Sequence, residues 1–338
     1  IGYRMADHQL DEACYDLLAS EARLASLFAV AKGDVATDHW FHLGRPIVEI
    51  GFRGALMSWS GSMFEYLMPP LVMKEPQGGI LNQTNHLIIK RQMQYGHEKR
   101  IPWGISEAAF NARDRDMNYQ YTNFGVPGLG LKRGLALNTV VAPYATLLAS
   151  QYMPREAVQN LKRLNGLGAR GRYGYHDAVD FTPQRVPEGT DHAVVYNYFA
   201  HHSGMSIAAV ANVVFEGRMR DRFHSDPVIE SAELLLHVRL RHREHLPVGA
   251  DDAGVGDPGR LDRVEDGRQE LRRGRGAELV VDHHGHAALA GEDVGEGGAV
   301  DRRLERRARR VRRARDGLGL VGQHVGDQVA GRDLELER

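Results

Sequence analysis

The chain has 338 residues, and its 43 basic residues nearly balance its 44 acidic ones, so the formal net charge is −1. Its length indicates one large or two ordinary domains, and its balanced charge gives no reason to expect nucleic acid or an anionic membrane as a partner. The single cysteine, Cys14, cannot form an internal disulfide, which fits a reducing compartment. No run of about 18 uninterrupted apolar residues indicates a transmembrane helix.

Apolar residues recur with helical spacing along most of the first 236 residues. In residues 11–32, Leu17, Leu18, Leu24 and Phe28 lie on one face of a predicted helix. Further helices are predicted at residues 61–73, 81–96, 139–151, 154–164, 188–215 and 218–236. Three long connections separate them, at residues 44–60, 101–138 and 166–187, and loops of such length are usually functional. The pattern predicts a large all-α domain, and helical hairpins alternating with long loops favour a helical toroid of the (α/α)-barrel type.

The last third of the chain has a different composition. From Ala232 to Arg338 there is no Ser, Thr, Asn, Lys, Ile, Met, Phe, Tyr, Trp or Cys. All residue types present can be written with codons beginning in G or C, so our hypothesis is that the reading frame is lost near residues 236–243. We therefore expect a domain at residues 1–236, followed by an out-of-frame, low-complexity and disordered tail at 237–338. Its arginine-rich stretch, 301–316, is interpreted as solvated charge, not as a nucleic-acid site.

The segment 101–134 combines aromatic and charged side chains. The rings are those of Trp103, Phe110, Tyr119, Tyr121 and Phe124, and the charges belong to Glu107, Arg113, Asp114, Arg115 and Asp116. Flat rings stack on the C–H faces of sugars, charged groups bond to hydroxyls, and a carboxyl can act as acid, base or nucleophile. The segment therefore indicates a carbohydrate site, to which Trp59 adds another candidate platform. The alternative is an ordinary loop-rich core segment.

Several candidate ligands of the sugar have a second interpretation. Glu65 lies on an apolar helix and is either a substrate ligand or a buried hydrogen-bond hub. Arg113 and Asp114 belong to a run, residues 113–116, in which arginine and aspartate alternate. Local ion pairing is therefore their second interpretation. The pair His201–His202 is a candidate for lining a subsite, although capping and core roles are commoner. We expect no metal and no cofactor, because no metal-ligand spacing is evident.

Motifs in a fixed order carry a family resemblance from residue 15 to about residue 236. They include YDLLASEARLASLFAVAKGD, LMSWSGSMFEYLMPPLVM, YGHEKRIPWGISEAAFNARD, NYQYTNFGVPGLGLKRG and AHHSGMSIAAVANVVFEGRMRDRFHSDPVIESAELLL. The chain resembles the glycoamylase-like domain of bacterial cyclic β-1,2-glucan synthases. This resemblance implies an (α/α) barrel that is incomplete here, because the helices expected before Tyr15 are missing.

The same resemblance implies an activity and two catalytic residues. Domains of this family look like retaining transglycosylases that close β-1,2-glucan into rings through a glycosyl-enzyme intermediate, and related domains hydrolyse the glucan. The motifs WGISE and SEAR imply Glu107 as nucleophile and Glu21 as acid/base. From the residues alone, the favoured interpretation of Glu21 is an exposed helix glutamate that pairs with Arg23 or with nothing. Endo-hydrolysis and non-catalytic glucan binding are the alternative functions.

The resemblance also implies a setting for the domain. It lies between a membrane-embedded glycosyltransferase region and a phosphorylase-like region, which would be its partners, on the cytoplasmic side of the bacterial inner membrane. A chain that begins at Ile1 and lacks both regions is expected to be a fragment of such a synthase.

Overall fold

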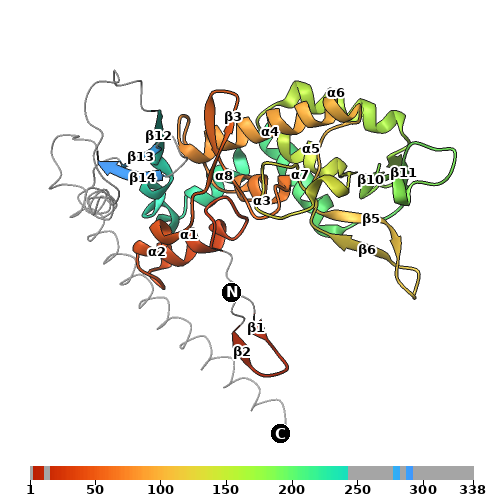
Figure 1. The fold of residues 1–338 in the computed structure, drawn as a ribbon. Coiled ribbons are helices and arrows are strands. Elements are labelled where there is room, and N and C mark those ends of the chain that lie inside the picture. The colour runs from red at the N-terminus through yellow and green to blue at the C-terminus, as the bar shows by residue number, and fades with distance from the viewer. Residues whose placement is uncertain (1–2, 11–15, 243–276, 282–286, 292–338) are drawn as a thin grey trace, which may run out of the picture.

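The computed structural model describes residues 3–10, 16–242, 277–281 and 287–291 (Figure 1). The helices are α1 Arg23–Lys32, α2 Asp38–His42, α3 Met63–Leu67, α4 Ile80–Lys99, α5 Pro143–Ala149, α6 Pro154–Gly166, α7 Ala200–Val214, α8 Arg218–His224 and α9 Pro227–Glu230. Short 3₁₀ helices cover Pro69–Leu71, Leu135–Leu137, Pro183–Arg185 and Glu233–His237. Helices are therefore present in each predicted region, although α7 begins only at Ala200, so residues 188–199 of the predicted helix at 188–215 are not helical.

The prediction of an exclusively helical domain is not confirmed. Strands are β1 Tyr3–Arg4, β2 Gln9–Leu10, β3 Ile47–Ile50, β4 Arg53–Leu56, β5 Ala108–Arg113, β6 Tyr119–Thr122, β7 Val140–Val141, β8 Arg170–Gly171, β9 Gly174–Tyr175, β10 Ala178–Asp180 and β11 Ala193–Val195. They pair as hairpins β1–β2, β3–β4, β5–β6 and β8–β9 and as the antiparallel sheet β11–β10–β7. Each of the three predicted long connections contains a hairpin, and the β-branched and aromatic side chains of β3 and β6 favour strands in two of them.

The first predicted helix is shorter than expected, and its buried face is different. Residues 16–22 precede α1, and the Leu18 N–H donates to the Gly44 carbonyl at 2.9 Å. Within α1 the buried residues are Arg23 and Leu27, whereas Phe28 is 47% exposed. Leu17 and Leu18 precede α1 and so do not share a helical face with Leu24 and Phe28, which is why the predicted face is wrong. Residues 11–15 lie outside the described residues.

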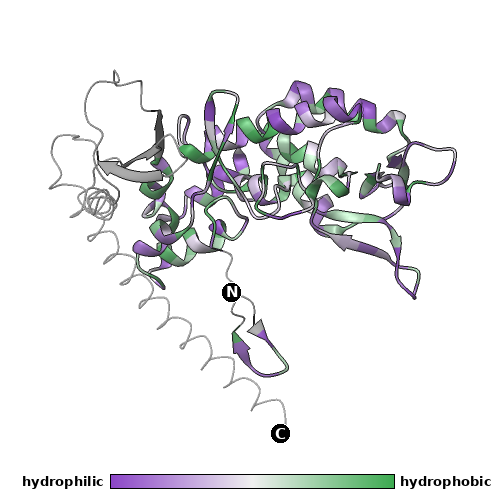
Figure 2. Cartoon of the chain, in the orientation of Figure 1, coloured by the Kyte–Doolittle hydropathy of each residue, from purple (hydrophilic) through white to green (hydrophobic). Residues whose placement is uncertain are grey.

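The core forms around α4 and α5. Helix α4 packs on the β3–β4 hairpin and on α3, and α5 packs against α3, α6 and α7. On α6 the buried residues are Ala157, Asn160 and Leu164, and most of that helix is hydrophilic (Figure 2). This is the pattern of a surface helix with one inward stripe. Among the described residues, no helix combines the length and apolar character needed to cross a membrane.

Long-range hydrogen bonds tie the end of the domain to its beginning. The buried indole N–H of Trp40 donates to the Leu235 carbonyl at 3.1 Å. The Ile80 N–H donates to the Val238 carbonyl at 2.7 Å. Leu236 and Val238 are also buried. The packed core thus extends to Val238, slightly beyond the predicted domain end at residue 236.

Most of the predicted tail lies outside the described residues. The described part includes strands β12 Arg239–His242, β13 Ala277–Val281 and β14 Ala287–Gly291. β12 pairs with β13 in parallel, and β13 pairs with β14 antiparallel. The expected low-complexity tail thus includes three described strands, and its expected disorder stays a prediction. The proposed loss of the reading frame stays a hypothesis, which the nucleotide sequence would test.

A close backbone approach in the core requires glycine at position 125. A Cβ added to Gly125 would lie 1.8 Å from the Ser60 carbonyl oxygen, which is backbone and cannot swing aside. We expect Gly125→Ala to destabilise the domain by about 3 kcal/mol, because overpacking forces a backbone shift. Urea unfolding followed by tryptophan fluorescence measures the loss.

Gly204→Ala is the matched control for this substitution. Gly204 lies in α7, and a Cβ there would meet nothing within 4 Å. Alanine is expected to stabilise this helix by about 0.5–1 kcal/mol through its higher helix propensity. Equal stability of the Gly125→Ala variant and the unmodified chain would contradict the close approach.

Candidate active site

The backbone of Glu107 is fixed at the start of β5 by buried hydroxyl groups. Its N–H donates to the Ser62 Oγ at 3.1 Å, and its carbonyl accepts from the Tyr144 hydroxyl at 2.9 Å. The Ser106 Oγ lies 2.8 Å from both the Ser62 Oγ and the Tyr144 hydroxyl. Ser62 caps α3 and Tyr144 lies on α5, so two core helices position this residue.

The Glu107 carboxyl lies in a half-buried, polar environment. Its Oε1 accepts a 2.6 Å hydrogen bond from the hydroxyl of Tyr121, whose side chain extends from β6. Burial raises the pKa of Glu107 above 4.5 as the largest effect, the Tyr121 hydrogen bond lowers it, and the negative charge of Glu21 raises it. The carboxyls of Glu107 and Glu21 are thus close enough to interact electrostatically.

A buried pair of side chains, His202 and Asp177, adjoins Tyr121. The His202 Nδ1 is 2.6 Å from the Asp177 Oδ1, and its Nε2 is 3.3 Å from the Tyr121 hydroxyl oxygen. The other Asp177 oxygen accepts from the Ala109 N–H at 2.7 Å. The Tyr144 ring stacks on the His202 ring, with centroids 3.7 Å apart. Hydrogen bonds therefore connect Asp177, His202, Tyr121 and Glu107 in a row.

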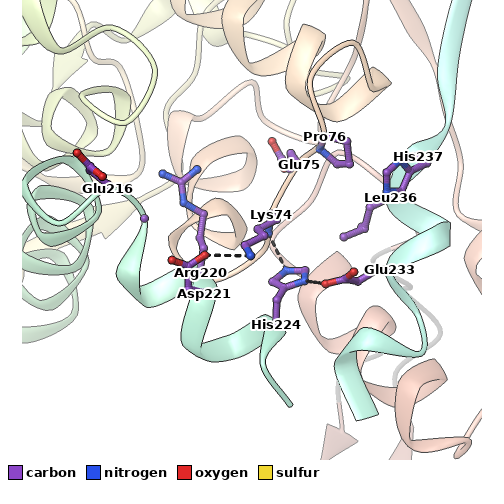
Figure 3. A pocket seen from close by; sticks show the side chains of 11 residues that line it. Lys74, Glu75, Pro76, Glu216, Arg220, Asp221, His224, Glu233, Leu236 and His237 are labelled. Carbon is purple, nitrogen blue, oxygen red and sulfur yellow. Dashed lines mark hydrogen bonds and ion pairs between the residues drawn. The ribbon is translucent and has the colours of Figure 1, made fainter. Parts of the chain in front are cut away.

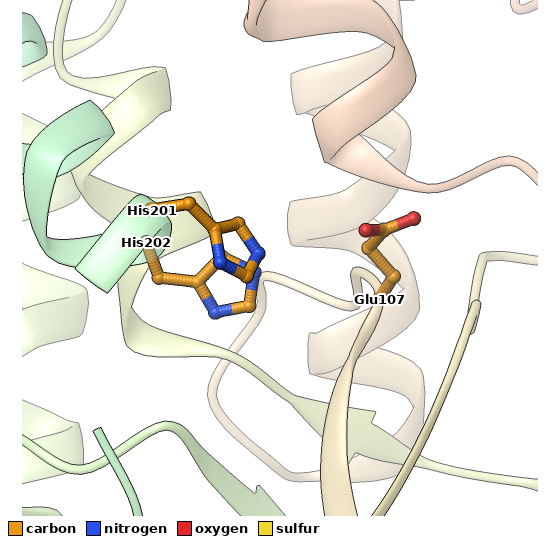
Figure 4. A group of neighbouring side chains, drawn as sticks. All are labelled: Glu107, His201 and His202. Carbon is orange, nitrogen blue, oxygen red and sulfur yellow. The ribbon is translucent and has the colours of Figure 1, made fainter. Parts of the chain in front are cut away.

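Glu107 also belongs to a group of side chains that could hold a cation. One ligand atom from each of Glu107, His201 and His202 lies within 4.8 Å of the other two (Figure 4). Within the described residues this is the one group of three or more such side chains. The sequence predicted no metal site, because these histidines are far from Glu107 along the chain. The Tyr121 hydroxyl, bonded to Glu107 and His202, occupies part of the space between them.

Glu21 lies in the turn just before α1 and is half-buried. Its Oε2 accepts from the hydroxyl of buried Ser20 at 3.1 Å. The pairing of Glu21 with Arg23, considered from the sequence, does not occur: Arg23 forms its ion pair with Glu75, at 3.0 Å. Glu21 is therefore left with a partly exposed carboxyl on the Glu107 side of the domain.

Two of the predicted sugar platforms are core residues. Trp103 and Phe124 are almost completely buried. Trp103 is fixed through its backbone by Asn160, and the Phe124 ring packs edge-on against Phe110 with centroids 5.5 Å apart. A ring without exposed surface cannot stack on a sugar, so the prediction of substrate contact is wrong for Trp103 and Phe124. Both residues instead pack in the core, which was the alternative interpretation of the segment 101–134.

Glu65 is a buried hydrogen-bond hub, the second of its two interpretations. Its side chain is 4% exposed and accepts from the hydroxyls of Ser58 and Ser60, both at 2.7 Å. The N–H groups of Ser60 and Ser62 also donate to it, at 3.1 Å. These donors stabilise a carboxyl whose pKa is raised, mainly by burial. With its oxygens used internally, Glu65 is not placed to bind substrate.

Arg113 and Asp114 shape the turn of the β5–β6 hairpin, which points away from the body of the domain (Figure 1). The Asp114 Oδ1 accepts from the N–H groups of Asp116 and Asn118, both at 2.9 Å. The Arg113 guanidinium lies 3.4 Å from the Tyr119 ring centroid. These local contacts account for Arg113, Asp114 and Tyr119 without a substrate. Trp59 is half-buried, and its role as a platform stays a prediction.

Of the predicted site residues, Glu107 and Tyr121 are hydrogen-bonded to each other and Tyr121 is 40% exposed, and their role in binding or catalysis stays a prediction. Asp177 and Tyr144 were not predicted from the sequence, which indicated His202 only as a candidate for lining a subsite. A pocket of about 240 Å³ adjoins them, lined in part by Tyr173, His176, Tyr198, Phe199 and Ser203. The GRYGYHD segment at residues 171–177, rich in glycine and aromatic residues, was the available signal. It lies in the third long connection, residues 166–187, for which no function was predicted from the sequence.

A larger pocket lies elsewhere, between the segment before α4 and α8 (Figure 3). It measures about 420 Å³ and shares no lining residue with the Glu107 cluster. The Lys74 ammonium pairs with Asp221 at 2.9 Å, and the Lys74 N–H donates to the His224 Nε2 at 2.8 Å. The His224 Nδ1 also lies 2.5 Å from the Glu233 Oε1, so two pairs of lining side chains are bonded to each other.

The pattern around this site is that of a known family. A family model described as "Putative glucoamylase" matches residues 14–227. The chain belongs to this family. The resemblance found in the motifs is therefore confirmed.

A curated relative and a solved structure show similarity beyond the family model. Over 236 residues the chain is 71% identical to cyclic beta-(1,2)-glucan synthase NdvB of Rhizobium meliloti (strain 1021), an alignment that covers 70% of this chain and 8% of the relative. The chain thus spans a small part of that protein's length. An endo-beta-1,2-glucanase from Chitinophaga pinensis, solved with sophorotriose and glucose, is 14% identical, with a TM-score of 0.45 over 62% of this chain and 52% of that one.

Proposed function

We propose that this chain is part of a retaining enzyme that acts on β-1,2-glucan and transfers the glucan chain onto its own hydroxyl to form a ring. The observation that carries the proposal is the 71% identity to a cyclic beta-(1,2)-glucan synthase. The geometry of Glu107 supports it, because a rigidly held, half-buried carboxyl with a second carboxyl in electrostatic range is what double displacement needs.

In this mechanism Glu107 is the nucleophile. Its carboxylate forms a bond to the anomeric carbon while Glu21 donates a proton to the departing glycosidic oxygen. The tyrosine hydrogen bond holds the Oε1 of Glu107 in place, which leaves the other oxygen free to attack. Glu21 then accepts the proton of a glucan hydroxyl, and that oxygen displaces Glu107 to close the ring.

The raised pKa of Glu107 predicts the acid side of the pH profile. Glu107 must be ionised to attack, and burial holds its pKa above 4.5. The rate should therefore fall as the pH decreases through this raised value, at a higher pH than for an ordinary glutamate.

We infer that the neighbouring aromatic pocket, with the exposed rings of Tyr173 and Tyr198, holds glucose units near the reacting bond.

This chain aligns with 8% of the synthase, so the proposal extends to the regions around it. We propose an (α/α) barrel closed by helices that precede the chain, flanked by a glycosyltransferase and a phosphorylase-like region of a membrane-bound synthase. Catalysis would then take place on the cytoplasmic side of the inner membrane.

The product formed from linear β-1,2-glucan tests the proposal. A version of the domain extended by the preceding helices is incubated with the glucan, and the products are separated by chromatography and mass spectrometry. Rings, which weigh one water less than linear chains of equal length, are expected. Shorter linear chains would indicate endo-hydrolysis, the alternative that applies if water reaches the intermediate. Unchanged glucan that nevertheless binds the domain would leave only a binding role.

A further inference from the structure

Glu107, His201 and His202 bring three groups that bind metal ions to one place. One oxygen or ring nitrogen from each lies within 4.8 Å of the other two, and both imidazole rings extend from the first turn of α7 toward Glu107 (Figure 4). Around a tetrahedral zinc ion the donor atoms are about 3.4 Å apart, so the group has to contract only slightly. Because the His201 side chain is exposed, it has room to rotate inward.

A buried carboxylate orients His202 as a metal ligand. The Nδ1 of His202 lies 2.6 Å from the Asp177 Oδ1, and both side chains are almost completely buried. The other Asp177 oxygen accepts from the Ala109 N–H at 2.7 Å, which fixes the carboxylate in turn. Since a carboxylate only accepts, the neutral ring keeps its hydrogen on Nδ1 and directs the Nε2 lone pair at the Tyr121 hydroxyl. Histidines that bind metals almost always have such a partner on their second nitrogen.

The other two ligands have electron pairs that no described group uses. Within the described residues, nothing forms a hydrogen bond with the ring nitrogens of His201. The Glu107 carboxyl accepts from Tyr121 through Oε1, so its Oε2 has no partner among the described residues. The carboxyls of Glu21 and Asp177 interact electrostatically with Glu107, and their negative charges favour a cation beside it.

The Tyr121 hydroxyl competes with a cation for His202. Its oxygen lies 3.3 Å from the His202 Nε2, which is a long contact, and 2.6 Å from the Glu107 Oε1, which is a short one. A cation on Nε2 has to displace the long contact. It leaves the short one intact if it binds Glu107 through Oε2.

We propose that Glu107, His201 and His202 form a binding site for Zn²⁺. Two imidazoles with one carboxylate suit Zn²⁺, whereas Mg²⁺ and Ca²⁺ take oxygen ligands. Three protein ligands leave the fourth position of the zinc ion open to water. Zinc holds the electron pair with which the Glu107 carboxylate would attack the anomeric carbon, so Zn²⁺ should inhibit glucan conversion. This inhibition, unlike the site itself, rests on the proposed function of Glu107 as nucleophile.

Calorimetric titration of the full chain with zinc chloride tests the site without substrate. Histidine-rich tracts bind metals by themselves, so every variant is made in a background in which the three histidines of the segment 283–286 are alanine. We expect one tight site per chain. A titration without such a site overturns the proposal.

Substitutions in and near the group assign the tight site to it. Asp177→Asn should weaken zinc binding by about 10- to 100-fold, as expected for the partner of a histidine ligand, and His201→Ala by at least as much. His201 is exposed, so its replacement does not disturb the core. His97→Ala is the matched control, because His97 is an exposed histidine on α4. Equal affinity in His201→Ala and His97→Ala overturns the proposal.

Tyr121→Phe gives a change in the opposite direction. It removes the competing hydroxyl, so zinc should bind about fivefold more tightly, since one hydrogen bond no longer has to break. Tyr119→Phe is its control, because Tyr119 lies on the same strand and its hydroxyl accepts from the Tyr196 N–H, at 3.3 Å. Unchanged or weaker binding in Tyr121→Phe contradicts a cation at the His202 Nε2 and overturns the proposal.

Activity separates failure of this inference from failure of the proposed function. In the complete domain, Zn²⁺ should stop ring formation and a chelator should restore it, and His201→Ala should resist Zn²⁺ by the factor by which it loses affinity. Inhibition of equal strength in His201→Ala overturns the proposal, because the cation would act elsewhere. Zinc bound by this group in a domain that never converts glucan supports the site and refutes the enzyme. Ring formation by a domain that binds no zinc supports the enzyme and refutes the site.

Discussion

Replacing Glu107 by Gln is expected to lower the rate of glucan conversion by the complete domain by about 10⁴-fold or more, because an amide cannot form the glycosyl-enzyme bond. Gln retains the shape of the side chain and can still accept from Tyr121, whose hydroxyl is 2.6 Å from the Glu107 carboxylate. Glucan binding should therefore change little. Initial rates of product formation and calorimetric titration with glucan measure the two effects.

The acid/base assignment predicts a smaller loss for Glu21→Gln, about 10²- to 10⁴-fold, since one proton transfer is removed. Azide separates the two roles. In Glu107→Ala, azide takes the place of the nucleophile and yields a glycosyl azide of inverted configuration. In Glu21→Ala, it attacks the glycosyl-enzyme and yields the retained configuration. The opposite pair of products would exchange the roles of Glu107 and Glu21.

Glu98→Gln is the control for these substitutions, because Glu98 is an exposed glutamate on α4 that pairs with Arg91 at 3.0 Å. It should leave the rate unchanged. Full activity in Glu107→Gln would refute its catalytic role, whatever the product of the unmodified domain.

Replacing Arg23 by Met is expected to destabilise the domain by about 3–5 kcal/mol, because it leaves a buried charge without its partner. Arg23 is 1% exposed, and its guanidinium donates to the carbonyls of Ser20, Glu65 and Tyr66 and to the Glu75 carboxylate. This one side chain joins α1 to α3 and to the segment before α4. Urea unfolding monitored by circular dichroism measures the loss.

Two further variants separate the buried charge from lost packing. Arg23→Met combined with Glu75→Gln removes both charges and should recover part of the stability. Arg91→Met breaks the half-exposed pair with Glu98 and should cost about 1 kcal/mol or less. A loss in Arg23→Met no larger than that in Arg91→Met would contradict a structural role for the buried pair.

The local pattern of apolar residues predicted most helices correctly, but it did not predict which side chains are exposed. Helix α6 begins at Pro154, as predicted, because proline suits the first turn and the apolar stripe follows at helical spacing. Trp103 and Phe124 were predicted as sugar platforms, yet both are buried. Composition cannot tell a ring that faces the core from one that faces a cleft, because this depends on which distant segments cover it.

By itself, the sequence determined the family and most of the helices and predicted Glu107 and Tyr121 as site residues, because ordered motifs and helical periodicity are local properties. Only the tertiary structure decided that Asp177 and His202 are joined to these residues by hydrogen bonds. It also decided that Glu65 is a buried hydrogen-bond hub. Hydrogen bonds act over about 3 Å in space, and the chain brings such partners together only when its helices and hairpins pack.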